Sequence, residues 1–377
     1  MYDLIIVGGG MSGISVGHFF RDQNILILEK GELLSGATGH NAGFLITGFG
    51  EHFCRTVQRC GDDRAAEIQK IHLSSHKKIR ELTNDVINCG SISVGITDKE
   101  TEELRKSFDL MRTAGFHVEW IEYASCGLKN QRPALLNLDD GLLDSTRFWQ
   151  QISSTLPCKT NTNVISVIDE GNSLRVITSA GEFSTKQIVY CLNAYSGDLV
   201  RELTGCIIPL RAQMLELEIF DKPGCTQPVI AEYGEIYWNF TADTLRFGGL
   251  EYMIPSDEVG IATSLSQPVL EAQLNWIHRN LSVSCASTPH KTWFGTMGFT
   301  VDGFPIVGRL PGRNLTYVLA GMCGLGHSYA MECARWLYEL IANNRNIIPE
   351  YFSSDRIQKL PRYSGGDWRI LYEAWNH

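Results

Sequence analysis

The stretch Asp3–Gly13, DLIIVGGGMSG, decides the fold class of this 377-residue chain. An apolar run of strand length leads directly into glycines, and Gly8, Gly10 and Gly13 have the spacing GxGxxG. The residues that follow place apolar side chains at helical intervals. This order of strand, glycine turn and helix predicts a βαβ unit that binds the pyrophosphate of a dinucleotide.

Each glycine has a distinct role in such a turn. Gly8 makes the tight turn, Gly10 lets a pyrophosphate approach the backbone, and Gly13 allows the helix to pack closely on the strand. The helix start, with Met11 and Ser12, offers free amide groups and the positive end of the helix dipole to the phosphates.

A second buried strand supports the same interpretation. The stretch NILILEK ends in Glu29 and Lys30, and Glu29 stands where the acidic residue of a dinucleotide site accepts hydrogen bonds from a ribose. The motif is shared by FAD and NAD proteins, so by itself it does not choose between them.

The composition excludes several classes of protein. The net charge is −9, and no cluster of lysine and arginine compares to a phosphate-tracking stripe, which disfavours nucleic-acid binding. No apolar run reaches the roughly 18 residues of a membrane span, and the first strand begins too early to follow a signal peptide. The eleven cysteines are odd in number and lack CxxC spacing, which argues against a disulfide framework or a metal site. We expect a reduced, cytoplasmic protein.

The rest of the chain contains no repeats or low-complexity linkers. Amphipathic helices are expected at 64–86, 98–115, 141–156, 264–281 and 326–344, and strands within 164–192, 211–252 and 314–321. Elements typical of a nucleotide domain therefore open the chain, return in the middle and return near the end. This order predicts two interleaved domains.

Taken together, five stretches resemble the FAD-dependent amine and amino-acid oxidoreductases of the D-amino acid oxidase, glycine oxidase and sarcosine oxidase superfamily. They are the start with Glu29, GATGHNAGF, GLLDSTRF, VYCLNAYSG, and GFTVDGFPIVG followed by AGMCGLGH. The forms GHNAG and NAY look most like the γ-glutamylputrescine-oxidase branch. The ordered set covers nearly the whole chain and favours FAD over NAD.

The resemblance implies an α/β fold with a Rossmann-like FAD-binding domain of glutathione-reductase type. An α+β substrate domain on a largely antiparallel sheet would interrupt it. The expected boundaries are 1–80, 141–208 and 291–345 for the FAD domain, 81–140 and 209–290 for the substrate domain, and 346–377 for a C-terminal extension.

The same resemblance implies roles for single positions. Gly39–Gly43 would pass beside the flavin and pyrophosphate, Val164 beside the adenine, and Gly324–His327 beside the pyrimidine end. Asp302 would be an acid near the ribityl chain, or simply a turn former before glycine. The residues implied to bind FAD are Gly8, Gly10, Met11, Ser12, Gly13, Glu29, Lys30, Thr38, Gly39, His40, Asn41, Ala42, Gly43, Val164, Asn193, Asp302, Gly324, Leu325, Gly326 and His327.

His40 has three open interpretations. It aligns with a histidine that is bonded covalently to flavin in the dimethylglycine-dehydrogenase branch, although the tryptophan that precedes that histidine is missing here. It could instead make a non-covalent contact with flavin or substrate, or be a solvated loop residue.

The reaction implied is hydride transfer from a carbon beside nitrogen to flavin N5, which gives an imine that water hydrolyses.

Two departures from the family concern the substrate. Met297 stands where many relatives have a carboxylate-binding arginine, and Arg246 stands near the position of the oxygen-activating lysine of sarcosine oxidases. The candidate substrate-side residues are Tyr237, Arg211, His327, Met297 and Tyr252, with Trp238 and Trp293 as further aromatic candidates.

Alternatives remain for these residues and for the activity. Each aromatic could be core packing, and Arg211 could bind a carboxylate or hold a domain interface. The electron acceptor could be oxygen or another molecule, and the partner is expected to be a small amine or amino acid. An NAD-dependent dehydrogenase and a flavin-holding subunit without turnover are the competing hypotheses, and the sequence does not indicate an oligomeric state.

Overall fold

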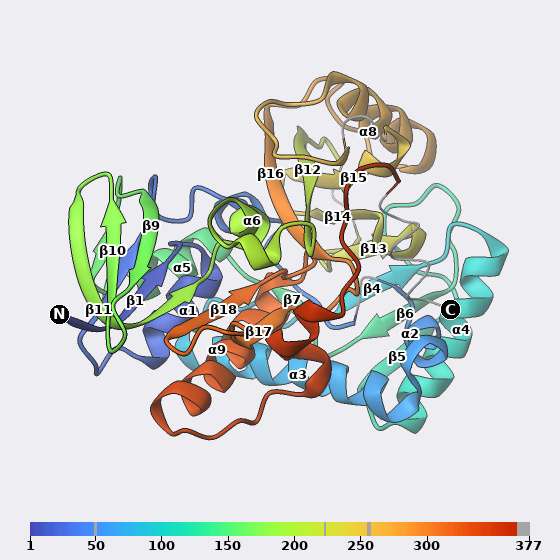
Figure 1. Ribbon diagram of the computed structural model, residues 1–377. Helices are drawn as coiled ribbons and strands as arrows, with labels where there is room; N and C mark the ends of the chain where they lie inside the picture. The colour runs from blue at the N-terminus through green and yellow to red at the C-terminus, as the bar shows by residue number, and fades with distance from the viewer. Residues whose placement is uncertain (49–50, 222–223, 255–257, 368–377) are drawn as a thin grey trace. The chain divides into compact units, whose positions relative to one another are not determined.

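The computed structural model describes residues 1–48, 51–221, 224–254 and 258–367 (Figure 1). The chain forms two compact units that alternate along the sequence. Unit 1 consists of Met1–His40, Ser145–Leu210 and Thr296–His377, and unit 2 of Asn41–Asp144 and Arg211–Gly295.

Unit 1 is built on a sheet whose central strands are parallel. Its path is β17-β18-β11-β1-β2-β8, with the β9–β10 hairpin attached to β11. The strands are β1 (Tyr2–Val7), β2 (Ile25–Leu28), β8 (Cys158–Lys159), β9 (Val164–Asp169), β10 (Leu174–Thr178), β11 (Gly181–Tyr190), β17 (Ile306–Arg309) and β18 (Thr316–Ala320). β18, β11, β1, β2 and β8 pair in parallel, whereas β17 is antiparallel to β18.

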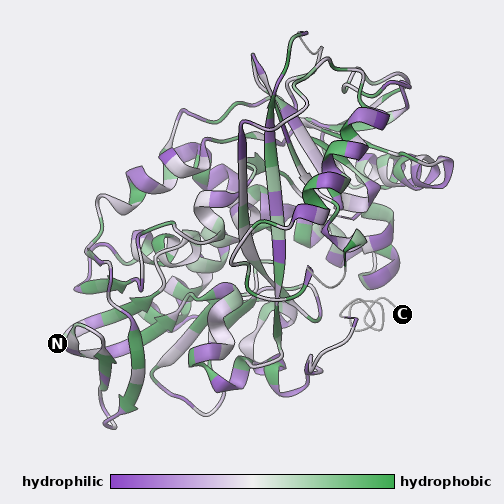
Figure 2. Ribbon diagram, turned by 90° about the horizontal axis from the view of Figure 1, so that it is seen from above, coloured by the Kyte–Doolittle hydropathy of each residue, from purple (hydrophilic) through white to green (hydrophobic). Residues whose placement is uncertain are grey.

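Helices pack on this sheet because its central strands are apolar on both faces. β1 and β2 are buried along nearly their whole length, as expected for a parallel sheet with both faces covered. The unit's helices and 3-10 turns are α1 (Met11–Phe19), η1 (Ala37–His40), α5 (Ser145–Ser153), η2 (Asn193–Tyr195), α6 (Ser196–Leu199), η3 (Arg201–Leu203), α9 (Gly326–Ala342), η6 (Glu350–Phe352) and η7 (Ser354–Gln358). In Figure 2 the strands are largely green, while the helices alternate between green and purple along their length.

Unit 2 is built on a second, mostly antiparallel sheet. The order is β16-β12-β15-β14-β13-β4-β6-β5, in which β13 and β4 are parallel and the pairs β12–β15, β15–β14, β14–β13, β4–β6 and β6–β5 are antiparallel. The strands are β4 (Ser91–Val94), β5 (Val118–Ile121), β6 (Ala134–Asn137), β12 (Ile207–Glu218), β13 (Val229–Ala231), β14 (Ile236–Phe240), β15 (Thr244–Gly249) and β16 (Lys291–Thr300). β12 and β16 each contain a point at which the chain passes between units.

The remaining elements of unit 2 are mostly helices. They are β3 (Phe44–Leu45), α2 (Phe53–Cys60), α3 (Asp62–Leu82), α4 (Asp98–Thr113), β7 (Gly141–Leu142), η4 (Glu232–Gly234), η5 (Glu251–Met253) and α8 (Gln267–Asn280). The helices expected at 64–86, 98–115 and 264–281 are thus present as α3, α4 and α8. Ser266 precedes α8 as its N-cap, and its side chain accepts the Val269 N–H, as N-cap serines do.

One hydrophobic core of unit 2 lies on the face of its sheet that α8 covers. Trp238 and Phe247 pack there against Trp276 of α8, with ring centroids 5.5 and 5.3 Å apart. Trp238 is fully buried and donates its indole N–H to the Cys126 carbonyl. The idea that Trp238 lines a substrate site is therefore wrong, because alternate residues of a strand point to opposite faces and Trp238 points into the core.

The two-unit division differs from the expected domain boundaries. The first boundary lies after His40 rather than near residue 80, because α2 and α3 belong to unit 2. The segment after 345 belongs to unit 1 rather than forming a separate extension, and Arg356 of η7 pairs with Asp302.

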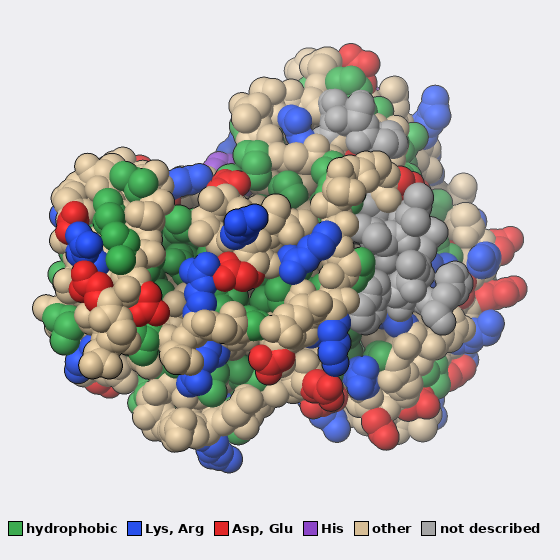
Figure 3. Space-filling model, viewed as in Figure 1, with side chains coloured by type: hydrophobic (Ala, Val, Ile, Leu, Met, Phe, Trp, Pro, Cys, Tyr) green, Lys and Arg blue, Asp and Glu red, His purple; other side chains and the backbone are tan. Residues whose placement is uncertain are grey.

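Among the described residues, no helix has the length and apolar character needed to cross a membrane. On the face shown in Figure 3, basic and acidic side chains are interspersed.

Candidate functional site

The carboxyl ends of three parallel strands of unit 1 converge at one edge of its sheet. β1 leads into Gly8, β11 into Asn193, and β18 into Gly321. The Asn193 side-chain oxygen accepts the N–H groups of Gly321 and Met322, both at 3.0 Å. Ligands of open α/β sheets bind at this edge, so Asn193 fixes two of the loops that would form such a site.

The glycines of the first turn are required by close backbone approaches. Gly8 has a φ of +113°, and a Cβ there would lie 2.5 Å from the Cys191 carbonyl oxygen. A Cβ on Gly13 would lie 1.9 Å from the Gly8 carbonyl oxygen. The chain can therefore turn tightly out of β1 and seat α1 only with glycine at both positions.

Gly10 and Thr38 lie at the N-terminus of α1. The Met11 N–H donates to the Thr38 hydroxyl at 2.9 Å, and a Cβ on Gly10 would lie 3.1 Å from that hydroxyl. Thr38 is buried, so the helix start is enclosed by a polar group rather than by a bulky side chain. This is a cradle for an anionic group.

Glu29 lies beside the same turn at the end of β2. Its two carboxylate oxygens accept the N–H groups of Gly9 at 2.7 Å and Gly31 at 2.9 Å. Lys30 lies 4.0 Å above the ring of Tyr195. The carboxylate is thus held in place by backbone donors next to the phosphate cradle.

The GATGHNAGF loop is compact because of contacts within the chain itself. A Cβ on Gly39 would lie 2.4 Å from the Leu34 carbonyl oxygen, and one on Gly43, where φ is +75°, would lie 2.5 Å from the Leu143 carbonyl oxygen. Gly36 has no atom within 4 Å of its Cβ direction. The fold of the chain therefore requires glycine at positions 39 and 43, independently of any ligand.

Two residues of this loop are held by neighbouring backbone. His40 is exposed, and its Nδ1 lies 2.9 Å from the Gly36 carbonyl oxygen. The Asn41 side chain accepts the Gly43 N–H at 2.7 Å. Both contacts order the stretch in which the chain leaves unit 1 and enters unit 2.

His327, at the start of α9, is buried in unit 1. Its Nε2 lies 3.0 Å from the Ser145 hydroxyl, and its ring stacks on Trp149 with a centroid distance of 6.3 Å and an interplanar angle of 8°. Ser145 and Trp149 both belong to α5 and were not among the residues singled out from the sequence. The sequence could have indicated Ser145, because this residue lies in GLLDSTRF, one of the stretches that carry the resemblance.

Asp302 is engaged by the C-terminal part of unit 1. It is buried, and its carboxylate forms an ion pair with Arg356 at 2.7 Å and accepts the Phe304 N–H. Met297, in β16, lies against Gly324, where an added Cβ would be 3.5 Å from the Met297 sulfur. The turn-forming interpretation of Asp302 fits these contacts, and its placement beside a flavin stays a prediction.

In unit 2, Tyr237 lies in a row of residues across three strands. It is opposite Gly248 of β15, which is opposite Met214 of β12. A Cβ on Gly248 would lie 2.5 Å from the Tyr237 ring, and Phe44 meets the ring edge-on at 6.0 Å. Burial, followed by the nearby carboxylates Glu251 and Glu235, raises the pKa of Tyr237, so the phenol remains neutral.

Other candidate residues of unit 2 are bonded to their neighbours. Tyr252 donates its hydroxyl to Glu232 at 2.7 Å, and Arg211 donates to the Ser264 carbonyl at 3.2 Å. Arg246, on the same face as Tyr237, pairs with Glu216 at 2.9 Å. Thus Arg211, Tyr237 and Tyr252 belong to one unit, whereas His327 and Met297 belong to the other.

The residues at the edge of the unit 1 sheet fit a bound dinucleotide. Gly10 leaves the start of α1 open to a phosphate, and Glu29 stands beside it as an acceptor for a ribose. The model of the family described as FAD dependent oxidoreductase matches residues 3–340 of the chain. The chain belongs to this family. The resemblance inferred from the sequence motifs is thereby confirmed, and FAD is the cofactor.

Known members of the family are distant relatives of this FAD-dependent oxidoreductase. It is 22% identical to glycine oxidase from Geobacillus kaustophilus (strain HTA426) over 85% of this chain and 87% of that protein. It is 23% identical to gamma-glutamylputrescine oxidoreductase from Escherichia coli (strain K12) over 98% and 89% of the two chains.

Solved structures share the fold. The crystal structure of glycine oxidase from Geobacillus kaustophilus gives a TM-score of 0.76 at 19% identity and covers 97% of this chain and 99% of that one. L-proline dehydrogenase from P. horikoshii gives a TM-score of 0.75 at 20% identity, over 95% and 98% of the two chains. At these identities the likeness establishes the fold, and the substrate has to be argued from this chain.

Proposed function

We propose that this FAD-dependent oxidoreductase oxidises a C–N bond of an amine or amino acid. The observation that carries the proposal is the complete dinucleotide cradle of unit 1, with Gly10, Thr38 and Glu29, in a family whose two relatives above are named for amine substrates. When bound, FAD would supply the hydride acceptor, and the substrate would leave as an imine that water hydrolyses. The FAD unit would be of the glutathione-reductase type.

The residues of the chain would hold the cofactor and exclude water. The N-terminus of α1 and the Thr38 hydroxyl would meet the pyrophosphate, and Glu29 would meet the adenosine ribose. Asn193 would keep the loops after β11 and β18 in place by its two backbone contacts. His327 would lie near the cofactor as a stacked imidazole held by Ser145.

The substrate side would favour the neutral amine, because a buried apolar surface disfavours the ammonium form. Tyr237, Met214 and Phe44 supply such a surface on the sheet of unit 2. With Met297 in place of an arginine, simple glycine and D-alanine are expected to be oxidised slowly. Any recognition of a carboxylate would then fall to Arg211.

A second candidate is a dehydrogenase that passes electrons to an acceptor other than oxygen. Arg246 favours it, because the guanidinium at this position is paired with Glu216, which also accepts from His290 at 3.1 Å. A cation neutralised in this way is a weaker promoter of oxygen reduction than a solitary lysine would be. Hydrogen peroxide production in air would identify the oxidase, and reduction of a quinone or dye without peroxide would identify the dehydrogenase.

The cytoplasm is the proposed compartment. All eleven cysteines are free, and free thiols in this number are typical of a reducing compartment.

One experiment tests the activity directly. The holoprotein is mixed without oxygen with a panel of amines and amino acids, and flavin bleaching near 450 nm is followed. Bleaching by at least one amine supports the proposed function, whereas a flavin that no amine reduces, but that dithionite does reduce, contradicts it.

A further inference from the structure

A row of charged side chains crosses the sheet of unit 2 next to the apolar row that contains Tyr237. In the charged row, Arg246 of β15 lies opposite Glu216 of β12. In the apolar row, two residues away on each strand, Gly248 lies opposite Met214. Alternate residues of a strand point to the same face, so both rows lie on one face of the sheet. They are about 7 Å apart, because a strand rises about 3.4 Å per residue.

Both carboxylate oxygens of Glu216 are already engaged by protein groups. One accepts from Arg246 Nε at 2.9 Å, and the other lies 3.1 Å from His290 Nε2. The His290 backbone N–H also donates to the Glu216 carbonyl at 3.1 Å, which holds the imidazole close to the carboxylate. The Glu216 side chain is only 11% exposed. This row therefore has little capacity to bind a cation.

Arg246 keeps most of its capacity to donate hydrogen bonds. Within residues 1–48, 51–221, 224–254 and 258–367, its guanidinium makes one hydrogen bond, from Nε, and no protein group accepts from its two terminal nitrogens. The side chain is 41% exposed. The terminal nitrogens form a planar fork that matches the two oxygens of a carboxylate. Because Glu216 already orients the guanidinium, less conformational freedom is lost when the fork binds a ligand.

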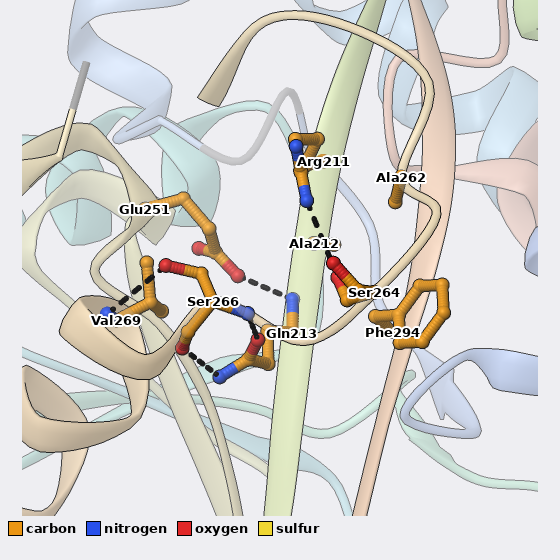
Figure 4. A pocket seen from close by; sticks show the side chains of 9 residues that line it. All are labelled: Arg211, Ala212, Gln213, Glu251, Ala262, Ser264, Ser266, Val269 and Phe294. Atoms are coloured by element: carbon orange, nitrogen blue, oxygen red, sulfur yellow. Dashed lines mark hydrogen bonds between the residues drawn. The ribbon is translucent and has the colours of Figure 1, made fainter. Parts of the chain in front are cut away.

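The other candidate arginine lies on the opposite face of the sheet. Arg211 lines a small pocket at the start of α8. Figure 4 shows it directed at the Ser264 carbonyl, to which it donates at 3.2 Å. α8 packs on the core face of the sheet, whereas Tyr237 points to the other face. For a ligand that lies against Tyr237, Arg246 is therefore the better candidate for binding a carboxylate.

We propose that Arg246 binds a carboxylate that the substrate carries several carbons away from its reacting amine. The amine end lies on the apolar row of Tyr237, Gly248 and Met214, and the carboxylate accepts from both terminal nitrogens of Arg246. An α-amino acid holds its two groups too close together to reach from one row to the other. The inference rests on the proposed function and narrows its substrate to amines with a remote carboxylate.

The test compares three probes of the same chain length. 5-Aminopentanoate has a remote carboxylate, its isomer 2-aminopentanoate has the carboxylate beside the amine, and 5-aminopentanamide has no carboxylate. The flavin of the holoenzyme is reduced beforehand, so that turnover does not disturb a calorimetric titration without oxygen. We expect 5-aminopentanoate to bind about 10-fold more tightly than either of the others, because it alone gains the charge-assisted contact. Equal affinities for the three probes would overturn the proposal.

Single substitutions assign the contact to one arginine. Arg246→Gln should weaken the binding of 5-aminopentanoate to the level of its amide and leave the binding of the amide unchanged. Arg279→Gln is the matched control, because that side chain is exposed on α8, and it should keep the preference. If the preference survives in Arg246→Gln, or is lost in Arg211→Gln instead, the carboxylate binds elsewhere and the assignment to Arg246 is rejected.

The flavin separates this inference from the proposed function. If some amine bleaches the flavin but the three probes bind equally, only the carboxylate subsite is refuted. If 5-aminopentanoate binds through Arg246 while no amine bleaches the flavin, the subsite stands and the proposed oxidation is refuted.

Discussion

His327 Nε2 lies 3.0 Å from the Ser145 hydroxyl, which joins the first turn of α9 to the first turn of α5. The two residues are 182 positions apart in the sequence. Stacking on Trp149 fixes the plane of the same imidazole. The contact therefore holds the loop Gly324–Gly326 at the edge of the unit 1 sheet, where FAD is expected to bind.

Ser145→Ala tests this contact. Loss of the buried hydroxyl, which also donates to the Thr38 carbonyl oxygen at 3.4 Å, should lower the free energy of unfolding by about 1 to 2 kcal/mol and change the visible spectrum of the bound flavin. Thermal denaturation and absorption spectra measure the two effects. Ser145→Thr, which keeps the hydroxyl, is the control. A Ser145→Ala protein with unchanged spectrum and unchanged FAD affinity would show that the contact is purely structural.

Gly10→Val tests the phosphate cradle. The Cβ would already lie 3.1 Å from the Thr38 hydroxyl, so the two further methyl groups would close the start of α1 to a phosphate. The variant should fold but purify without yellow colour. Gly224→Val is the control, because its Cβ would lie 3.8 Å from the nearest atom, in Ser125. Full FAD content in Gly10→Val would place the phosphate loop elsewhere.

His40 is expected to hold no covalent bond to flavin. Its Nδ1 is engaged by the Gly36 carbonyl at 2.9 Å, and this contact holds the exposed ring against its own loop. Acid precipitation of the holoprotein should leave the yellow colour in the supernatant, whereas a yellow pellet would establish the covalent bond. If His40→Ala then leaves spectrum and turnover unchanged, the imidazole has no role in the site.

Asp140 should make stability fall as the pH rises. It is buried in unit 2, where its oxygens accept from Ser91 at 2.6 Å and from the Thr47 backbone at 3.0 Å. Burial raises its pKa from 3.8 to about 7, so the folded state binds its proton more tightly than the unfolded state does. Its contribution is complete below pH 4 and is lost as the pH rises through 7.

Asp140→Asn removes this dependence. Relative to the wild type, the variant should gain on the order of 1 kcal/mol of stability per pH unit between pH 4 and 7. Denaturant unfolding at several pH values measures the difference. Asp109→Asn, at an exposed position on α4, should follow the wild-type curve. Parallel curves for Asp140→Asn and the wild type would mean that the pKa of Asp140 does not differ between the folded and unfolded states.

Local patterns in the sequence were enough to predict the family, the cofactor and most helices. Part of the GxGxxG turn depends on contacts between residues close in sequence, such as Gly13 against Gly8. The motif can therefore be recognised from the spacing of its glycines. The apolar periodicity of α3, α4 and α8 is equally local. The ordered motifs from Asp3 to His327 therefore predicted an FAD-dependent oxidoreductase, as the family match bears out.

Tertiary structure decided which residues share a surface. Tyr237 and Trp238 are neighbours in sequence and equally aromatic, yet the pleat sends one to the face with Met214 and the other into the core. Nothing in the sequence indicated where Glu251 lies, because its position depends on the left-handed turn after β15 and on the amide of Gln213 in another strand. Burial and pairing across strands arise only when distant segments meet, and a single sequence does not specify which segments do.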